Sequence, residues 1–229
     1  MSEGGATGTM LSAWLDLHGI TPPICRAILD LKPGRDGANA VALPAVGKGP
    51  DCNWAAIAEA LCRWQPDCAA TIRATTARTL TRFDPDPVKY PRPFTIADIG
   101  DGRPFVSVVW RGRVADQRAL AHEFGHAWQL VASEGRFMPP ILRETCAFLA
   151  EIHCMAGLPP EGAVQSDGAM WLDRLRTPER AAYDYDVNYP FARSLARSAA
   201  THPGAVQIDD LFSGRISTAE LVAILSDKG

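Results

Sequence analysis

The sequence ALAHEFGHAWQ, at residues 119–129, carries the clearest secondary-structure signal in the chain. Its large apolar residues recur every four positions, at Leu120, Phe124 and Trp128. Because residues with this spacing share one helix face, the pattern predicts an amphipathic helix over residues 116–132. Gly135 and the prolines at 139–140 then predict that this helix ends and that a second helix covers residues 140–155.

The same stretch contains the pattern H-E-x-x-H. His122 and His126 are four residues apart, so their imidazoles project from one helix face, one turn apart. This spacing suits one Zn²⁺ ion, which proteins bind through imidazole nitrogens. Glu123 follows the first histidine directly, and its carboxylate can reach a water molecule in the open coordination position. The motif therefore predicts a catalytic zinc site with Glu123 as general base.

A catalytic zinc ion needs a third protein ligand. Neither His153 nor His202 continues the motif at the spacing that a third histidine would require. Glu144 lies in the second predicted helix, which returns antiparallel to the first, and we expect its carboxylate to complete the ligand set. Glu151 shares a helix face with Glu144 and is expected to accept a hydrogen bond from a liganding imidazole.

The rest of the chain has mostly helical patterns. Gly, Pro and Asp cluster around residues 33–51 and 84–104, which predicts loops, and PFVSVVWR at residues 104–111 is the clearest strand. We therefore expect a mainly α fold with a small β-sheet. Residues 84–229 are expected to form a zincin-like catalytic domain, and residues 1–83 a helical N-terminal lobe, either separate or part of the same domain.

The composition is that of a globular protein. Of the 229 residues, 47% are hydrophobic, and the formal net charge of -3 contains no run of like charge, so neither nucleic acid nor a membrane is an expected partner. The N-terminus lacks a signal-peptide pattern, which favours a cytoplasmic location. The six cysteines form no C-x-x-C pair, and we interpret most as small buried apolar residues. A redox role for Cys52, Cys62 and Cys68 is the alternative.

Residues 104–151 resemble the gluzincin metallopeptidases, the family typified by thimet oligopeptidase and oligoendopeptidase F. That family has an apolar strand before the motif helix, an Asp six residues before the first His, and a small residue after the second His. Asp116 and Ala127 occupy these two positions here. The family's ligand Glu is followed by a small residue and a second Glu, as in Glu144, Ala147 and Glu151.

The resemblance implies one zinc ion on His122, His126 and Glu144, water activation by Glu123, and peptide bonds as substrate. It also places Asp116, together with Glu151, among the residues that support the ligands. The family carries a His and several tyrosines near its C-terminus that stabilise the substrate oxyanion. AAYDYDVNYPFARSLA, at residues 181–196, has tyrosines but no His. We therefore expect Tyr185 and Tyr189 to donate to the oxyanion.

The strand predicted over residues 104–111 can contribute to substrate binding. If it lies at the sheet edge beside the motif helix, the backbone groups of Ser107, Val108 and Val109 can pair with an extended peptide. A plain core strand is the alternative.

Three functions fit these residues. The favoured one is a zinc metallopeptidase that cuts a short peptide or an exposed segment of a protein. The second is a zinc-dependent hydrolase that acts on a non-peptide amide or a small metabolite. The third is a non-catalytic helical binding module, which the presence of Glu123 disfavours because a structural zinc site needs no general base.

Overall fold

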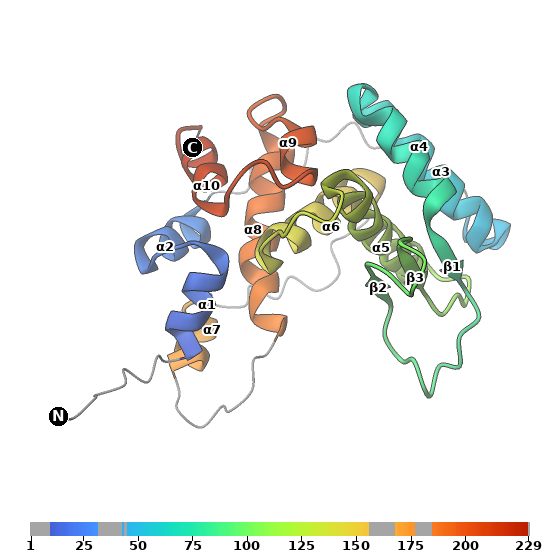
Figure 1. The fold of residues 1–229 in the computed structure, drawn as a ribbon, viewed down its shortest axis with the longest axis horizontal. Helices are drawn as coiled ribbons and strands as arrows, with labels where there is room; N and C mark the ends of the chain where they lie inside the picture. The colour runs from blue at the N-terminus through green and yellow to red at the C-terminus, as the bar shows by residue number, and fades with distance from the viewer. Residues whose placement is uncertain (1–9, 32–42, 44, 156–167, 177–184, 229) are drawn as a thin grey trace.

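The computed structural model describes residues 10–31, 43, 45–155, 168–176 and 185–228. These residues form a mainly helical fold with a three-stranded sheet, which confirms the predicted fold class at that level (Figure 1). The strands are β1 (Leu80–Arg82), β2 (Phe94–Ile96) and β3 (Phe105–Ser107). The helices are α1 (Met10–His18), α2 (Pro22–Asp30), α3 (Pro50–Trp64), α4 (Ala69–Arg78), α5 (Val114–Ser133), α6 (Pro140–Cys154), α7 (Gly168–Arg176), α8 (Asn188–Thr201), α9 (Ile208–Phe212) and α10 (Thr218–Ser226), with 3₁₀ turns η1 (Val46–Lys48), η2 (Pro66–Cys68) and η3 (Tyr185–Val187).

Helices α5 and α6 lie at the centre of the fold (Figure 1). They pack against each other, α3 and α4 contact α5, and α8 contacts α6. The apolar stripe of α5 explains this position, since Leu120, Phe124 and Trp128 are all buried. The two helices predicted over residues 116–132 and 140–155 are confirmed, with small shifts at their ends.

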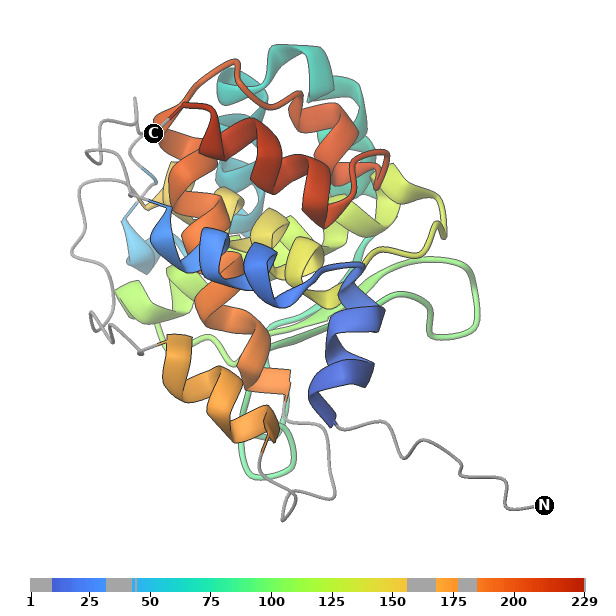
Figure 2. The same ribbon diagram turned by 90° about the vertical axis from the view of Figure 1, so that its left-hand side faces the viewer.

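Helix α8 is packed between α6 and an outer layer of helices. In the view turned by 90°, α2 and α10 lie in front of α8 (Figure 2), and both contact it. A buried hydrogen bond adds α1 to this arrangement, because Trp14 Nε1 donates to Asn188 Oδ1 at 3.0 Å. This hydrogen bond therefore connects the first residue of α8 to the N-terminal part of the chain.

The sheet has the strand order β1-β3-β2. β3 pairs in parallel with β1 and antiparallel with β2, so it is the middle strand. The strand predicted over residues 104–111 is shorter than expected, because its partners are themselves only three residues long. β1 precedes the predicted boundary at residue 83 and β3 follows it, and one hydrophobic core contains residues from both sides. The division into two parts stays a prediction.

Asp116 fixes the start of α5. Its Oδ2 accepts hydrogen bonds from the backbone N–H groups of Arg111 at 2.8 Å and Arg113 at 2.9 Å, and its Oδ1 accepts from the Arg113 guanidinium at 3.1 Å. Both oxygens are thus used to satisfy donors at the helix N-terminus. The expectation that Asp116 supports the metal ligands is therefore wrong, since its local role is to cap the helix.

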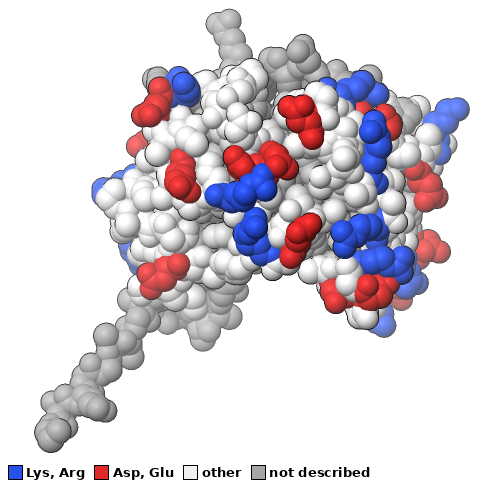
Figure 3. Space-filling model, turned by 45° about the horizontal axis from the view of Figure 1, so that its top comes forward, with Lys and Arg blue, Asp and Glu red and all other residues white. Residues whose placement is uncertain are grey.

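Charges of both signs are interspersed on the face drawn in Figure 3, in agreement with the small net charge. None of the described helices is long and apolar enough to cross a membrane. All six cysteines are free, and every one except Cys52 is buried. Burial raises the pKa of Cys25 and of Cys68 to about 11, so both are neutral thiols near pH 7. The prediction of buried apolar cysteines is confirmed for five of the six.

Candidate metal centre

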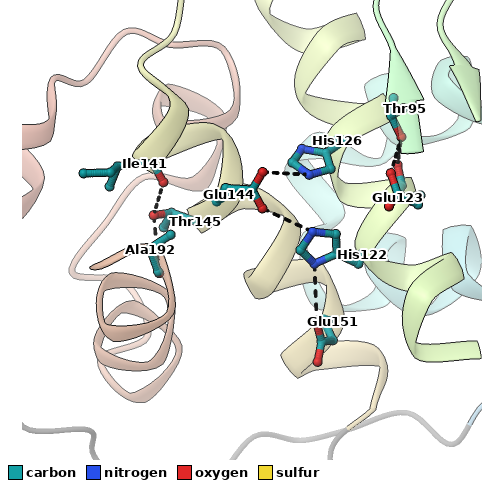
Figure 4. A network of polar contacts seen from close by, with 9 residues as sticks. All are labelled: Thr95, His122, Glu123, His126, Ile141, Glu144, Thr145, Glu151 and Ala192. Atoms are coloured by element: carbon teal, nitrogen blue, oxygen red, sulfur yellow. Dashed lines mark hydrogen bonds and ion pairs between the residues drawn. The ribbon is translucent and has the colours of Figure 1, made fainter. Parts of the chain in front are cut away.

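Three side chains from α5 and α6 point toward one another (Figure 4). Glu144 lies between the two imidazoles, with Oε2 at 3.2 Å from His122 Nε2 and Oε1 at 3.4 Å from His126 Nε2. One potential ligand atom from each residue lies within 4.8 Å of the others. The four-residue spacing on α5 aligns the histidines, and the antiparallel return of α6 brings Glu144 to them, as the sequence predicts.

The three groups share one buried electrostatic environment. Burial alone would raise the pKa of Glu144, but the imidazoles of His126 and His122 hold it well below its usual range. Burial alone would lower the pKa of His122, but the neighbouring carboxylates of Glu144 and Glu151 raise it to about 10. Glu144 is therefore an ionised carboxylate, and only 3% of its surface is exposed to solvent. A buried anion of this kind is a strong ligand for a cation.

The pattern of unsatisfied atoms fits a metal ion. Glu144 Oε2 is buried and makes no well-aligned hydrogen bond with the described residues, although it lies 3.2 Å from His122 Nε2. Buried polar atoms without a partner cost free energy, and a cation between the Nε2 atoms and the carboxylate would satisfy this one. Two imidazole nitrogens and one carboxylate oxygen form a donor set that zinc accepts with one position left open. The group can therefore hold a metal ion.

Gly125 allows the two central helices to approach closely. A Cβ atom at this position would lie 2.7 Å from Ala147 Cα, 2.9 Å from Ala150 Cβ and 3.0 Å from the Cys146 carbonyl oxygen. These distances are too short for real carbon contacts, so a side chain at residue 125 requires α6 to move. Glycine is unfavourable inside a helix by about 1 kcal/mol relative to alanine, and the close packing explains its presence here.

Replacing Gly125 with Ala is expected to destabilise the protein by about 1–3 kcal/mol, because the added methyl group overpacks the contact between α5 and α6. The added methyl group also pushes α6 away from α5, which moves Glu144 away from the two imidazoles and should weaken zinc binding. Thermal unfolding and zinc titration measure the two effects. Gly47→Ala is the matched control, since its Cβ meets nothing within 4 Å. Unchanged zinc affinity in Gly125→Ala would argue against this role of the glycine.

A second carboxylate supports His122 from behind. Glu151 Oε2 lies 3.4 Å from His122 Nδ1, which leaves Nε2 on the side of Glu144. The structure thus places Glu151 beside the imidazole of His122, a candidate ligand. Arg118 was not anticipated, although it lies one turn before His122. Its Nε lies 3.6 Å from Glu151 Oε1, so the guanidinium helps to orient the carboxylate that orients the imidazole.

Glu123 lies next to the histidines but outside the group of three ligands. Its Oε2 accepts a hydrogen bond of 2.6 Å from the hydroxyl of Thr95, on β2 (Figure 4). Glu123 is 6% exposed, so its carboxylate is held at a defined place in the wall of the site. Sequence reasoning did not identify Thr95, because it is 28 residues before Glu123 and no local pattern distinguishes it from other threonines.

The two candidate tyrosines lie along the α6 side of the site. Tyr185 interacts with the Glu144 carboxylate, and burial, followed by that charge, raises its pKa above the usual range. The Tyr189 ring lies 6.0 Å from the Phe148 ring, and burial, then Glu144, raises the pKa of Tyr189 to about 12. Both hydroxyls therefore stay protonated near pH 7 and can donate hydrogen bonds. Tyr183, the other tyrosine in the segment 181–196, lies outside the described residues.

The strand predicted to bind substrate is not at a sheet edge. Ser107 lies in β3 between two partner strands, and the N–H of Val108 donates to the Arg82 carbonyl at 3.0 Å. Val109 follows these paired residues. The prediction of pairing with an extended peptide is therefore wrong for Ser107, whose strand has partners on both sides, and stays a prediction for Val108 and Val109. Among the described strands, β2 is the edge strand that contacts α5.

Fold and site together define a mainly helical protein with a candidate metal centre of two histidines and one glutamate. Comparison with models of known protein families, with curated proteins and with solved structures finds no match. The similarity of residues 104–151 to the gluzincin metallopeptidases consequently stays a prediction. The candidate ligand set and the acid beside it are therefore the features that indicate a function.

Proposed function

We propose that this chain is a zinc-dependent metallopeptidase of the gluzincin type, with a zincin-like catalytic domain. The observation that carries the proposal is the convergence of Glu144 on the two Nε2 atoms, while Glu123 stays outside this group. A structural zinc site is closed by four protein ligands, whereas a catalytic site has three and an open position. The three candidate ligands, with Glu123 beside them and bonded to Thr95 instead, match a catalytic zinc site.

In this proposal a bound zinc ion supplies a Lewis acid that polarises the scissile carbonyl and lowers the pKa of water. Glu123 accepts a proton from the attacking water, and the Thr95 hydroxyl keeps the carboxylate in position. Tyr189 donates a hydrogen bond to the carbonyl oxygen of the substrate as negative charge develops on it. Glu123 then transfers the proton to the leaving amine, which completes hydrolysis.

The free edge of β2 is the proposed place for an extended substrate. β2 pairs with β3 on one side, and Thr95 connects it directly to the general base. Unpaired backbone groups of an edge strand can hydrogen-bond an extended peptide and so hold a carbonyl near the metal. This assignment replaces the one made for Ser107.

Replacing Thr95 with Val is expected to lower the turnover rate by about tenfold, because Glu123 loses the hydrogen bond that orients it. Thr95→Ser retains the hydroxyl and should retain most of the activity. Zinc content is expected to be equal in all three proteins, since Thr95 contacts none of the three ligands in Figure 4. A Thr95→Val enzyme with full turnover would exclude this positioning role.

The proposed activity is tested by incubating the zinc-loaded protein with a mixed-sequence peptide library and identifying new termini by mass spectrometry. Cleavage by the wild type and none by Glu123→Gln supports the peptidase. A protein that binds zinc fully but leaves every peptide and a panel of unfolded proteins intact would contradict it. In that case a non-peptide amide becomes the substrate class to examine.

A further inference from the structure

Two arginines lie beside the candidate active site, and neither is paired with an acid among the residues that the structure describes. Arg193 is on α8 and Arg143 is on α6, directly before Glu144. The Nε of Arg143 is buried and makes no hydrogen bond with the described part of the chain. Arg193 likewise forms no ion pair there, and its guanidinium instead lies over an aromatic ring. A cation held near a catalytic centre without a counter-charge is a candidate for substrate recognition.

Arg193 and the metal ligands share one aromatic side chain. The Cζ of Arg193 lies 4.7 Å from the centroid of the Phe148 ring. The same ring lies 4.9 Å from the His122 ring and 6.0 Å from the Tyr189 ring. Because an extended peptide advances roughly 3.5 Å per residue, a substrate group two or three residues from the scissile bond reaches this guanidinium.

The spacing on α8 explains why Arg193 faces the site. Tyr185, Tyr189 and Arg193 follow one another at intervals of four residues, so they lie on one side of η3 and α8. That side contacts α6, which carries Phe148 and Glu144. Arg143 approaches from α6 itself, and its charge acts on the Tyr185 hydroxyl. The two cations therefore come from the two helices that line the tyrosines.

The acids of the site do not neutralise these arginines. Glu144 is held between the imidazoles, Glu123 accepts from Thr95, and Glu151 is paired with His122 and Arg118. Asp186 is near Tyr189 and contributes one negative charge. Among the described residues, Arg143 and Arg193 thus form no ion pair with any of these acids.

We propose that Arg193, with Arg143, binds a carboxylate of the substrate. The preferred substrate is then a peptide with an acidic side chain or a free C-terminal carboxylate within two or three residues of the scissile bond. A guanidinium that stacks on a ring uses its face and keeps its in-plane N–H groups free, which suits bidentate binding of a carboxylate. This inference rests on the proposed peptidase function and adds its substrate class.

The test uses three peptide hydroxamates, which bind zinc directly and are not cleaved. One ends in a free carboxylate, the second ends in an amide, and the third combines a Glu side chain with an amide terminus. Calorimetry on the zinc-loaded wild type should show at least one carboxylate compound binding about tenfold tighter than the neutral amide. The two carboxylate compounds distinguish a terminal from a side-chain group.

Arg193→Gln should reduce this preference to about twofold or less and leave binding of the neutral amide unchanged. Arg193→Lys retains the charge but loses the planar fork, so an intermediate preference is expected. Arg197→Gln, one turn further along α8, is the matched control and should keep the full preference. Circular dichroism verifies that each variant is folded.

Equal binding of the carboxylate and amide compounds to the wild type would overturn the inference. A preference that survives in the Arg143→Gln and Arg193→Gln double variant would also overturn it. These outcomes are separable from the peptidase activity. Cleavage of peptides without any carboxylate preference would reject only the arginine site, whereas the preference without cleavage of any peptide would reject only the peptidase.

Discussion

Replacing Glu123 with Gln is expected to lower peptide hydrolysis by about 10²–10⁴-fold, because the amide cannot accept a proton from water. Zinc affinity is expected to stay the same, since the Glu123 carboxylate bonds to Thr95 and not to the three ligands. Glutamine has the same shape and can still accept the Thr95 hydrogen bond. The substitution therefore separates chemistry from metal binding.

The measurement is the initial rate on a peptide identified in the library digest, with zinc content determined on the same samples. Glu59→Gln provides the control, because Glu59 is an exposed acid on α3. If Glu123→Gln retains more than about a tenth of the wild-type rate, general-base catalysis by this residue is excluded.

Replacing Glu144 with Ala is expected to weaken zinc binding by more than about 100-fold. The substitution removes the only anionic member of the ligand set and leaves two imidazoles without the carboxylate between them. Loss of an outer hydrogen-bond partner typically costs 10–100-fold in metal affinity, so loss of a direct ligand should exceed that range. Competition with a chromophoric chelator measures the affinity.

Glu151→Gln is the matched comparison for this effect. Glu151 contacts Nδ1 of His122, the ring nitrogen that faces away from Glu144. Its replacement should therefore lower the zinc affinity by about 10–100-fold. Equal affinities for wild type and Glu144→Ala, with a large loss in Glu151→Gln, would reverse the two roles. That outcome would require a different set of ligands.

The sequence was sufficient to predict the grouping of the candidate metal ligands, because the positions of these residues are set by local helix geometry. His122 and His126 are one turn apart on a helix whose apolar stripe is unambiguous, and the short turn before α6 forces an antiparallel return. Glu144 and Glu151, two turns apart on α6, then face the histidines.

The sheet and the support for Glu123 could not be predicted in this way. The order β1-β3-β2 depends on pairing between segments far apart in the chain, and the apolar sequence of residues 104–111 is equally compatible with an edge or a middle strand. The bond from Thr95 to Glu123 follows from that order. For Asp116 a local interaction decided the outcome. The family resemblance implied that its carboxylate supports the metal ligands, but the carboxylate accepts hydrogen bonds from backbone N–H groups at the start of α5.

The zinc content of the wild-type protein tests the central claim most directly. The protein should be purified without added metal, dialysed against metal-free buffer and examined by elemental analysis, with a parallel sample reconstituted with zinc. One zinc ion per chain, removed by a strong chelator and restored on reconstitution, is the predicted result. A protein that contains no zinc and binds none on reconstitution would contradict the metal centre and the catalytic mechanism that depends on it.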